Sequence, residues 1–168
     1  RAKVNQALQG LADHRGGNYV DPGSAVVHFS DYPHKVPDIA EWLGKLLDMP
    51  LAIDIETYSL KHYSAGIGTI TMCWSQHEGI AFAVDKDHTP AEAKHIRNLL
   101  QAFFEARTAK TLYHRSWFDV YVLVYQLFMK DVLDTEGLLY GLDVMLRNFE
   151  DTLLLRYLAT NTCAGNKL

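Results

Sequence analysis

The segment from Met49 to Leu60 most constrains how this 168-residue chain can fold. It contains the aliphatic residues Leu51, Ala52, Ile53 and Ile55, which are dense enough for a central β-strand. Asp54 and Glu56 nevertheless lie near the end of this strand. Side chains two positions apart on a strand point to the same side, so the two carboxylates are expected to crowd each other. Like charges this close cost stability unless something positive lies between them. The segment therefore predicts a central strand whose acidic end needs a cation.

The spacing of apolar residues predicts an α/β fold. Residues 1–24 are expected to form a short helix and a loop, or a linker. Strands are predicted at 25–29, 51–57, 67–75, 79–84 and 109–114, and helices at 36–47, 89–106, 116–128 and 149–161, with a polar linker around Gly137 and Gly141. The helix after Thr89 has the clearest start, because Pro90 suits the first helical position and Glu92 completes a capping box. Together these elements predict a mixed sheet flanked by helices.

The composition excludes several classes of protein. A hydrophobic content of 48% with 21% charged residues is typical of one soluble globular domain, and no apolar run is long enough to span a bilayer. Cys73 and Cys163 are the two cysteines; they argue against a disulfide framework or a structural zinc site and favour a reducing compartment. The net charge of −4 argues against a protein that grips long duplex DNA, which usually needs a basic surface.

An Asp and a Glu on one side of a strand can share divalent cations, because Mg²⁺ prefers oxygen ligands. Two such ions, about 3.5–4 Å apart, can hydrolyse a phosphodiester. This chemistry needs a further carboxylate, and Asp119, in an otherwise apolar helix, is a candidate. The alternative, a solvated acid in the first turn of that helix, stays open. The second Asp-x-Glu triplet, Asp134 and Glu136, follows charged residues and is predicted to belong to a loop.

Two stretches carry a resemblance to a known family. LAIDIETYSL, at 51–60, resembles the first motif of the DEDD superfamily of 3′–5′ exonucleases, and LYHRSWFDVYVL, at 112–123, resembles the second. The order of elements is similar to that of the proofreading domain of family A DNA polymerases, the DNA polymerase I type that includes phage enzymes. The resemblance covers residues 25–168 and implies a ribonuclease-H-like fold; residues 1–24 carry nothing diagnostic.

The resemblance also implies roles for individual residues. Asp54 would bridge two Mg²⁺ ions, with Mn²⁺ as an alternative, Glu56 would bind one ion and the terminal 3′-hydroxyl, and Asp119 would serve the second ion through water. Leu60 would pack against the terminal base. The remaining candidates for substrate binding are Thr57, Tyr58 and Arg115.

Two departures from the family pattern stand out. The family commonly has Asn where this chain has Arg115, which can contact a phosphate or pair with a nearby acid. The third motif, with the fourth carboxylate, is expected after Leu168, so this segment is expected to be weakly active or inactive alone. Asp151 matches a residue at a helix start and is not expected to be a ligand.

Some aromatic residues are predicted to lie in the core and others to bind bases. Aliphatic neighbours predict that Trp74 and Trp117 are core residues. Tyr58 and Tyr63, in the loop after the first motif, are better candidates for stacking on unpaired bases. His62, in the same loop, is expected to be an exposed histidine without a metal.

The resemblance implies a 3′–5′ exonuclease domain that removes nucleoside 5′-monophosphates from the 3′ end of single-stranded DNA. It would proofread beside a polymerase domain of the same chain, in the cytoplasm of a bacterium or an infected cell, without a membrane. One alternative is an exoribonuclease of the ribonuclease D type. The other is a non-catalytic scaffold that keeps the exonuclease fold.

Overall fold

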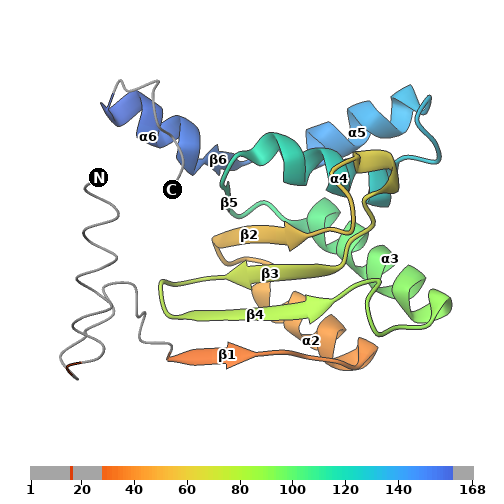
Figure 1. Ribbon diagram of the computed structural model, residues 1–168, viewed down its shortest axis with the longest axis horizontal. Coiled ribbons are helices and arrows are strands. Elements are labelled where there is room, and N and C mark those ends of the chain that lie inside the picture. Colours follow the sequence, from red (N-terminus) through yellow and green to blue (C-terminus); the bar gives the residue numbers. More distant parts are fainter. Residues whose placement is uncertain (1–15, 17–27, 161–168) are drawn as a thin grey trace.

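One mixed sheet of six strands organises the computed structural model, which describes residue 16 and residues 28–160 (Figure 1). The strands are β1 (Phe29–Asp31), β2 (Leu51–Glu56), β3 (Thr69–Cys73), β4 (Glu78–Ala83), β5 (Thr111–Tyr113) and β6 (Phe149–Asp151). Their order in the sheet is β1-β4-β3-β2-β5-β6. The pairings β2–β3 and β3–β4 are antiparallel, whereas β1–β4, β2–β5 and β5–β6 are parallel. This confirms the predicted mixed α/β sheet.

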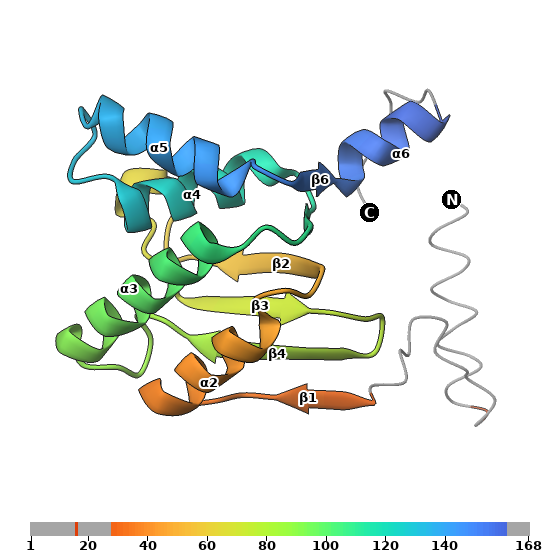
Figure 2. The same ribbon diagram turned by 180° about the vertical axis from the view of Figure 1, so that it is seen from behind.

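Helices cover one face of the sheet and one of its edges. The helices are α2 (Val36–Leu46), α3 (Pro90–Ala106), α4 (Ser116–Phe128), α5 (Thr135–Met145) and α6 (Thr152–Thr160). Helices α2 and α3 lie on the face turned to the viewer in Figure 2, and α4 and α5 pack together beside β5. Along β2, the side chains of Leu51, Ile53 and Ile55 are buried on the helical face. Asp54 and Glu56 therefore lie on the opposite, exposed face.

No helix in the described ranges is both long and apolar enough to cross a membrane.

The capping box before α3 is present as predicted. The Thr89 hydroxyl accepts a hydrogen bond from the backbone N–H of Glu92 at 3.3 Å, and the Glu92 carboxylate accepts one from the N–H of Thr89 at 2.9 Å. The first strand is displaced from its prediction. It runs from Phe29 to Asp31 because these residues pair with Glu78–Ile80 of β4. Residues 1–15 and 17–27, with most of the predicted N-terminal helix, linker and strand, lie outside the described residues.

The predicted linker around Gly137 and Gly141 is wrong, because these residues belong to helix α5. Asp134 is the N-cap of this helix and accepts a hydrogen bond from the N–H of Gly137 at 2.9 Å. Gly141 lets α5 approach α4 closely, since a Cβ there would lie 2.8 Å from Cγ1 of Val124. Each glycine costs roughly 1 kcal/mol of helix propensity, which tertiary packing offsets. The second Asp-x-Glu triplet is therefore a helix start and not a loop.

The last predicted helix begins later than its sequence pattern indicates. Residues 149–151 form β6, which pairs with β5 in parallel, and α6 begins at Thr152. The cause is tertiary: a short strand forms because the exposed edge of β5 accepts it.

Arg107 joins three segments beneath the sheet. Its buried guanidinium donates to backbone carbonyl oxygens of Leu46 at 2.8 Å, Met49 at 3.0 Å and Lys110 at 3.1 Å. The last carbonyls of a helix have no partner within it, and a cation complements the negative end of the helix dipole. Arg107 thus ties the end of α2 to the residues that precede β2 and β5, and so fixes where both strands begin.

We expect Arg107→Met to lower the free energy of unfolding by about 2–4 kcal/mol, because it leaves several buried carbonyls unsatisfied. Urea denaturation followed by circular dichroism measures this. Arg147→Met is the matched control, since that more exposed guanidinium donates to one carbonyl, that of Glu105, at 3.3 Å. Equal losses in the two variants would contradict the role of Arg107.

Candidate active site

The parallel pairing of β2 with β5 brings acids from distant parts of the sequence together. Ala52 pairs with Leu112, so the chain leaves β5 beside the second half of β2. It turns at once into α4, whose first turn carries Asp119. Ligand sites commonly lie where the carboxyl ends of parallel strands meet. The topology therefore places Asp119 at the same edge of the sheet as the two acids of β2.

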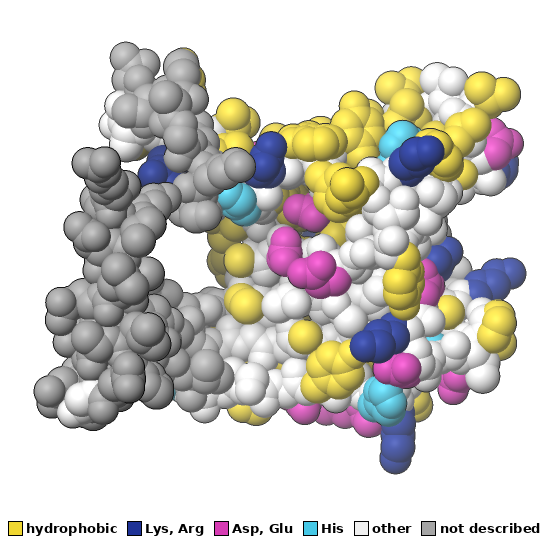
Figure 3. Space-filling view, in the orientation of Figure 1, with side chains coloured by type: hydrophobic (Ala, Val, Ile, Leu, Met, Phe, Trp, Pro, Cys, Tyr) yellow, Lys and Arg dark blue, Asp and Glu magenta, His cyan; other side chains and the backbone are white. Residues whose placement is uncertain are grey.

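A cleft of about 350 Å³ lies at this edge. It is lined by Asp54, Ile55, Glu56, Leu60, His114, Arg115, Trp117, Phe118 and Asp119. Figure 3 shows acidic side chains gathered near the middle of this face, with hydrophobic side chains beside them. The structure thus brings together the three predicted metal ligands and two of the predicted substrate-binding residues.

Thr57 and Tyr58, the other two candidates for substrate binding, do not line the cleft. The Thr57 hydroxyl donates to the carbonyl oxygen of Ser59 at 3.0 Å. The Tyr58 ring packs against Gly66, which adopts a φ of +61° that favours glycine. In this structure both residues shape the loop that follows β2.

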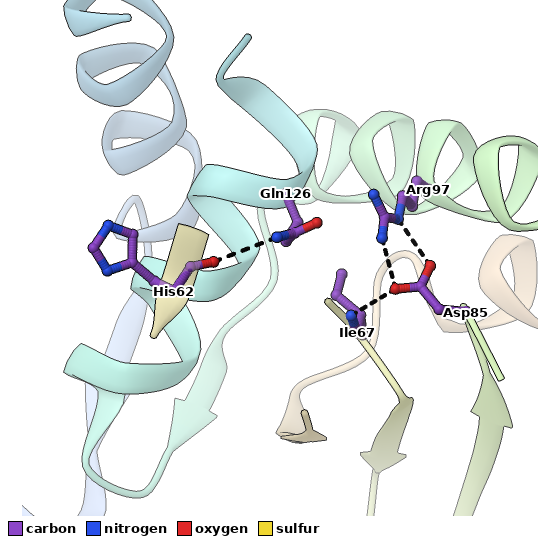
Figure 4. A network of polar contacts seen from close by, with 5 residues as sticks. All are labelled: His62, Ile67, Asp85, Arg97 and Gln126. Atoms are coloured by element: carbon purple, nitrogen blue, oxygen red, sulfur yellow. Dashed lines mark hydrogen bonds and ion pairs between the residues drawn. The ribbon is translucent and has the colours of Figure 1, made fainter. Parts of the chain in front are cut away.

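That loop is tied to two helices (Figure 4). The Asp85 carboxylate accepts the N–H of Ile67 at 2.8 Å and pairs with the guanidinium of Arg97 through contacts of 3.1 and 2.6 Å. Farther along, the Gln126 amide donates to the carbonyl oxygen of His62 at 3.3 Å. The loop is thereby held to α3 at one end and to α4 in its middle. Its exposed apolar residue, Leu60, lines the cleft.

The carboxylates in the cleft form no ion pair in the part of the chain that the structure describes, although Arg115 lines the same cleft. Within the described ranges, no hydrogen bond or ion pair engages the side chains of Asp54, Glu56 or Asp119. Asp119 is only 5% exposed. Burial first, and then the charges of Asp54, Glu56 and Asp151, together raise the pKa of Asp119 to about 7. The site therefore concentrates negative charge at a cost in stability, and the cation expected to offset it stays a prediction.

Hard divalent cations fit this set of donors. No three Asp, Glu, His or Cys side chains in the described part of the chain are close enough to form a metal cluster. Mg²⁺ seldom needs such a cage, because it keeps several waters and takes one or two carboxylates together with substrate oxygens. The roles of Asp54, Glu56 and Asp119 as metal ligands, the number of ions and their identity all stay predictions.

We expect Asp119→Asn to stabilise the metal-free protein at pH 8. The folded-state pKa of Asp119 is raised to about 7 from an ordinary 3.8, so wild-type stability falls as pH rises between these values. Asparagine does not ionise, and the gain should be about 1–2 kcal/mol, less than the full shift implies because the cleft is open to water. The gain should vanish near pH 4.

Thermal unfolding in a chelator at pH 4, 6 and 8 measures this difference. Added Mg²⁺ should raise the melting temperature of the wild type more than that of the variant, because binding to the folded state stabilises it. A wild type that is the more stable protein at pH 8 without metal would contradict this electrostatic account.

Asp151 holds the turn between β5 and α4. Its buried carboxylate accepts hydrogen bonds from the N–H of Arg115 at 3.2 Å, from the N–H and hydroxyl of Ser116, both at 2.8 Å, and from the N–H of Leu153 at 2.8 Å. Burial raises the pKa of Asp151, but these bonds outweigh it and hold the pKa below its ordinary value. The sequence predicted Asp151 at a helix start, and it does lie at the start of α6. Its carboxylate also caps α4 through Ser116, which precedes Asp119 by three residues.

Asp151→Asn should lower the free energy of unfolding by about 2–3 kcal/mol at pH 7, because an amide nitrogen cannot accept two of these bonds. Since the pKa of Asp151 is lowered, the loss should be complete above pH 5 and shrink in acid. Hydrogen exchange should quicken at the amides of Arg115 and Ser116. The control Asp131→Asn, at an exposed carboxylate that accepts the N–H of Leu133 at 2.8 Å through one oxygen, should change little because an amide oxygen can accept that bond; equal losses would contradict the role of Asp151.

Arg115 lies at the mouth of the cleft in an unusual backbone conformation. Its φ of 60° and ψ of 53° are left-handed, which costs a bulky residue roughly 1 kcal/mol or more. The bond from its N–H to Asp151 holds it there. Its exposed side chain pairs with no acid in the described ranges. A contact between Arg115 and a phosphate stays a prediction.

Two further residues show where the sequence was misleading. Trp117 was predicted to be a core residue, but it is 59% exposed and lines the cleft. His114 was not predicted at all, yet it lines the cleft, and its Nδ1 lies 2.9 Å from the Thr152 hydroxyl oxygen. Its only signal in the sequence is its position directly before Arg115. Trp74, by contrast, packs partly buried against the core, as predicted.

Comparison with known proteins shows the fold. The catalytic core of RRP6 from Trypanosoma brucei matches with a TM-score of 0.52 and 14% identity, over 84% of this chain and 33% of that chain. The EXO domain of Aedes aegypti Nibbler matches with a TM-score of 0.50 and 12% identity, over 89% of this chain and 66% of that chain. A chain in the structure of the yeast NOT1 MIF4G domain co-crystallized with CAF1 matches with a TM-score of 0.56 and 12% identity, over 85% of this chain and 75% of that chain.

These similarities show the ribonuclease-H-like fold, a mixed sheet flanked by helices. The chain spans only 33% of the RRP6 chain and 66% of the Nibbler chain. No protein-family profile matches the chain, and no curated protein matches its sequence.

Proposed function

We propose that the chain is a divalent-metal-dependent 3′–5′ exonuclease domain that removes nucleotides from the end of single-stranded DNA. The observation that carries this proposal is the cleft itself. Carboxylates from β2 and α4 line it, and no cation in the described part of the chain neutralises them. Unpaired carboxylates this close together cost stability, but they can bind the divalent ions that hydrolyse a phosphodiester.

Each group in the cleft has a part in this reaction. Bound Mg²⁺ ions supply Lewis acidity for the attacking water and the leaving oxygen. Asp54 and Glu56 hold the ions from the strand, and Asp119 completes the set from the helix. Leu60, 89% exposed at the cleft, offers an apolar surface to the terminal base. Arg115 would donate hydrogen bonds to a phosphate.

Size and charge favour a short unpaired substrate. A cleft of about 350 Å³ admits one or two nucleotides and not a duplex, and the net charge of −4 gives little long-range attraction for DNA. We propose that a polymerase domain in the same parent chain holds the duplex and passes frayed 3′ ends to this site, which would make the activity proofreading. The same cleft would also serve an exoribonuclease, so an assay has to decide whether the substrate is DNA or RNA.

We expect Asp54→Asn with Glu56→Gln to reduce release of nucleoside 5′-monophosphates by about a hundredfold or more, because metal stabilisation of the transition state is worth several kcal/mol. The assay uses 5′-labelled single-stranded DNA with Mg²⁺ and enzyme in excess, since turnover by this segment alone is expected to be slow. RNA of the same sequence and a 3′-mismatched primer are run beside it.

The matched control is Asp134→Asn with Glu136→Gln in the second Asp-x-Glu triplet. It makes the same change of charge at the start of α5, where Asn remains a good N-cap, and it should leave the rate unchanged. If both double variants degrade DNA like the wild type, Asp54 and Glu56 are not catalytic and the proposal fails. Faster degradation of RNA than of DNA would favour the ribonuclease alternative.

A further inference from the structure

We propose that an aromatic stripe beside the cleft binds the unpaired bases upstream of the terminal nucleotide. The aromatic stripe consists of Trp117, Tyr121 and Tyr125 on α4, with His62 and Tyr63 of the loop after β2. This inference rests on the proposed nuclease function and extends it to a second binding surface.

The stripe follows from helical spacing. Trp117, Tyr121 and Tyr125 are four residues apart, and residues at this spacing lie on one face of a helix. Trp117 is 59% exposed and Tyr121 is 48% exposed. The buried residues of α4, among them Val120, lie on its other side. The stripe is therefore a surface of the protein and not part of its core.

The loop after β2 adds two rings to this surface. The His62 ring centroid lies 5.5 Å from that of Tyr63, 6.0 Å from that of Tyr121 and 5.7 Å from that of Tyr125. The hydrogen bond from Gln126 to the carbonyl of His62 holds this part of the loop to α4 (Figure 4). The rings thus stand in a fixed arrangement before any ligand binds, which lowers the entropic cost of binding.

The stripe is continuous with the cleft. Trp117 belongs to both, and Leu60, from the same loop as His62, lines the cleft. A strand whose 3′ end sits at the carboxylates would pass directly over these rings. Aromatic side chains stack on any unpaired base, because every base has a π-face.

Spacing and charge favour a single strand over a duplex or an apolar protein partner. Residues four apart on a helix are separated by about 6 Å along its axis, whereas stacked bases in a duplex strand repeat every 3.4 Å or so; an unstacked strand can extend to match. Lys61, with its ammonium 6.0 Å from the Tyr63 ring, and Arg115 flank the rings. Neither forms an ion pair within the described ranges, so both are available to phosphates.

Tryptophan fluorescence tests the contact directly. Trp42 and Trp74 stack on each other, with ring centroids 5.8 Å apart, and pack against the core, so Trp117 is the tryptophan that a ligand can reach. Hexathymidylate should quench the emission of the full chain in the Asp54→Asn background, which prevents hydrolysis. Trp117→Phe should remove this quenching while it keeps an aromatic ring and most of the affinity.

Affinity measurements test the energetic role. Trp117→Ala and Tyr121→Ala should each weaken binding of labelled hexathymidylate by about tenfold, the typical value of one stacking contact, and should barely change binding of the same backbone with abasic sites. Tyr32→Ala is the matched control, because Tyr32 is also 48% exposed but lies beyond β1, away from the cleft. It should leave both affinities unchanged.

The outcomes separate this inference from the proposed function. If the wild type degrades DNA and both alanine variants keep full affinity for hexathymidylate, the stripe does not bind bases, and a protein partner becomes its expected occupant. Equal loss on the normal and the abasic strand would also overturn base stacking. If the wild type neither degrades nor binds single strands, the proposed function and this inference fail together.

Discussion

The carboxylate of Asp151 is the interaction on which the candidate site depends. It accepts four hydrogen bonds from the turn before α4 and from the start of α6, so it joins β5, β6 and both helices. A buried carboxylate is stable only when its acceptor capacity is used. Because the bonds end on Arg115 and Ser116, they fix the first turn of α4. The position of Asp119 is thus a consequence of a residue that is not itself expected to bind metal.

The cleft illustrates a conflict between stability and function. The buried side chain of Asp119 faces two other acids, and its pKa is raised to about 7 by burial first and by those charges second. A left-handed Arg115 adds backbone strain at the same place. Strain and unpaired charge persist where the surrounding structure over-determines them. Here the hydrogen bonds of Asp151 to Arg115 and Ser116 provide that support.

The loop after β2 and helix α4 form one surface around the carboxylates. The loop is anchored by Asp85 and Gln126, and it carries Leu60 to the cleft and His62 to the aromatic stripe. The acids, Leu60 and the aromatic stripe are therefore positioned by β2, the loop after it and α4. A strand that entered this surface would meet each of them in turn.

The sequence by itself determined the strand of β2 with its two acids, the capping box of α3 and the amphipathic helices, because these depend on periodicity and local hydrogen bonds. It also indicated Asp119 as a third acid. Only the tertiary structure decided that β6 exists, that the glycines of α5 lie in a helix, and that Trp117 is exposed. Each of these depends on a partner distant in sequence: an open strand edge, a close helix pair, or the side of α4 that faces the sheet. Local pattern does not contain that information.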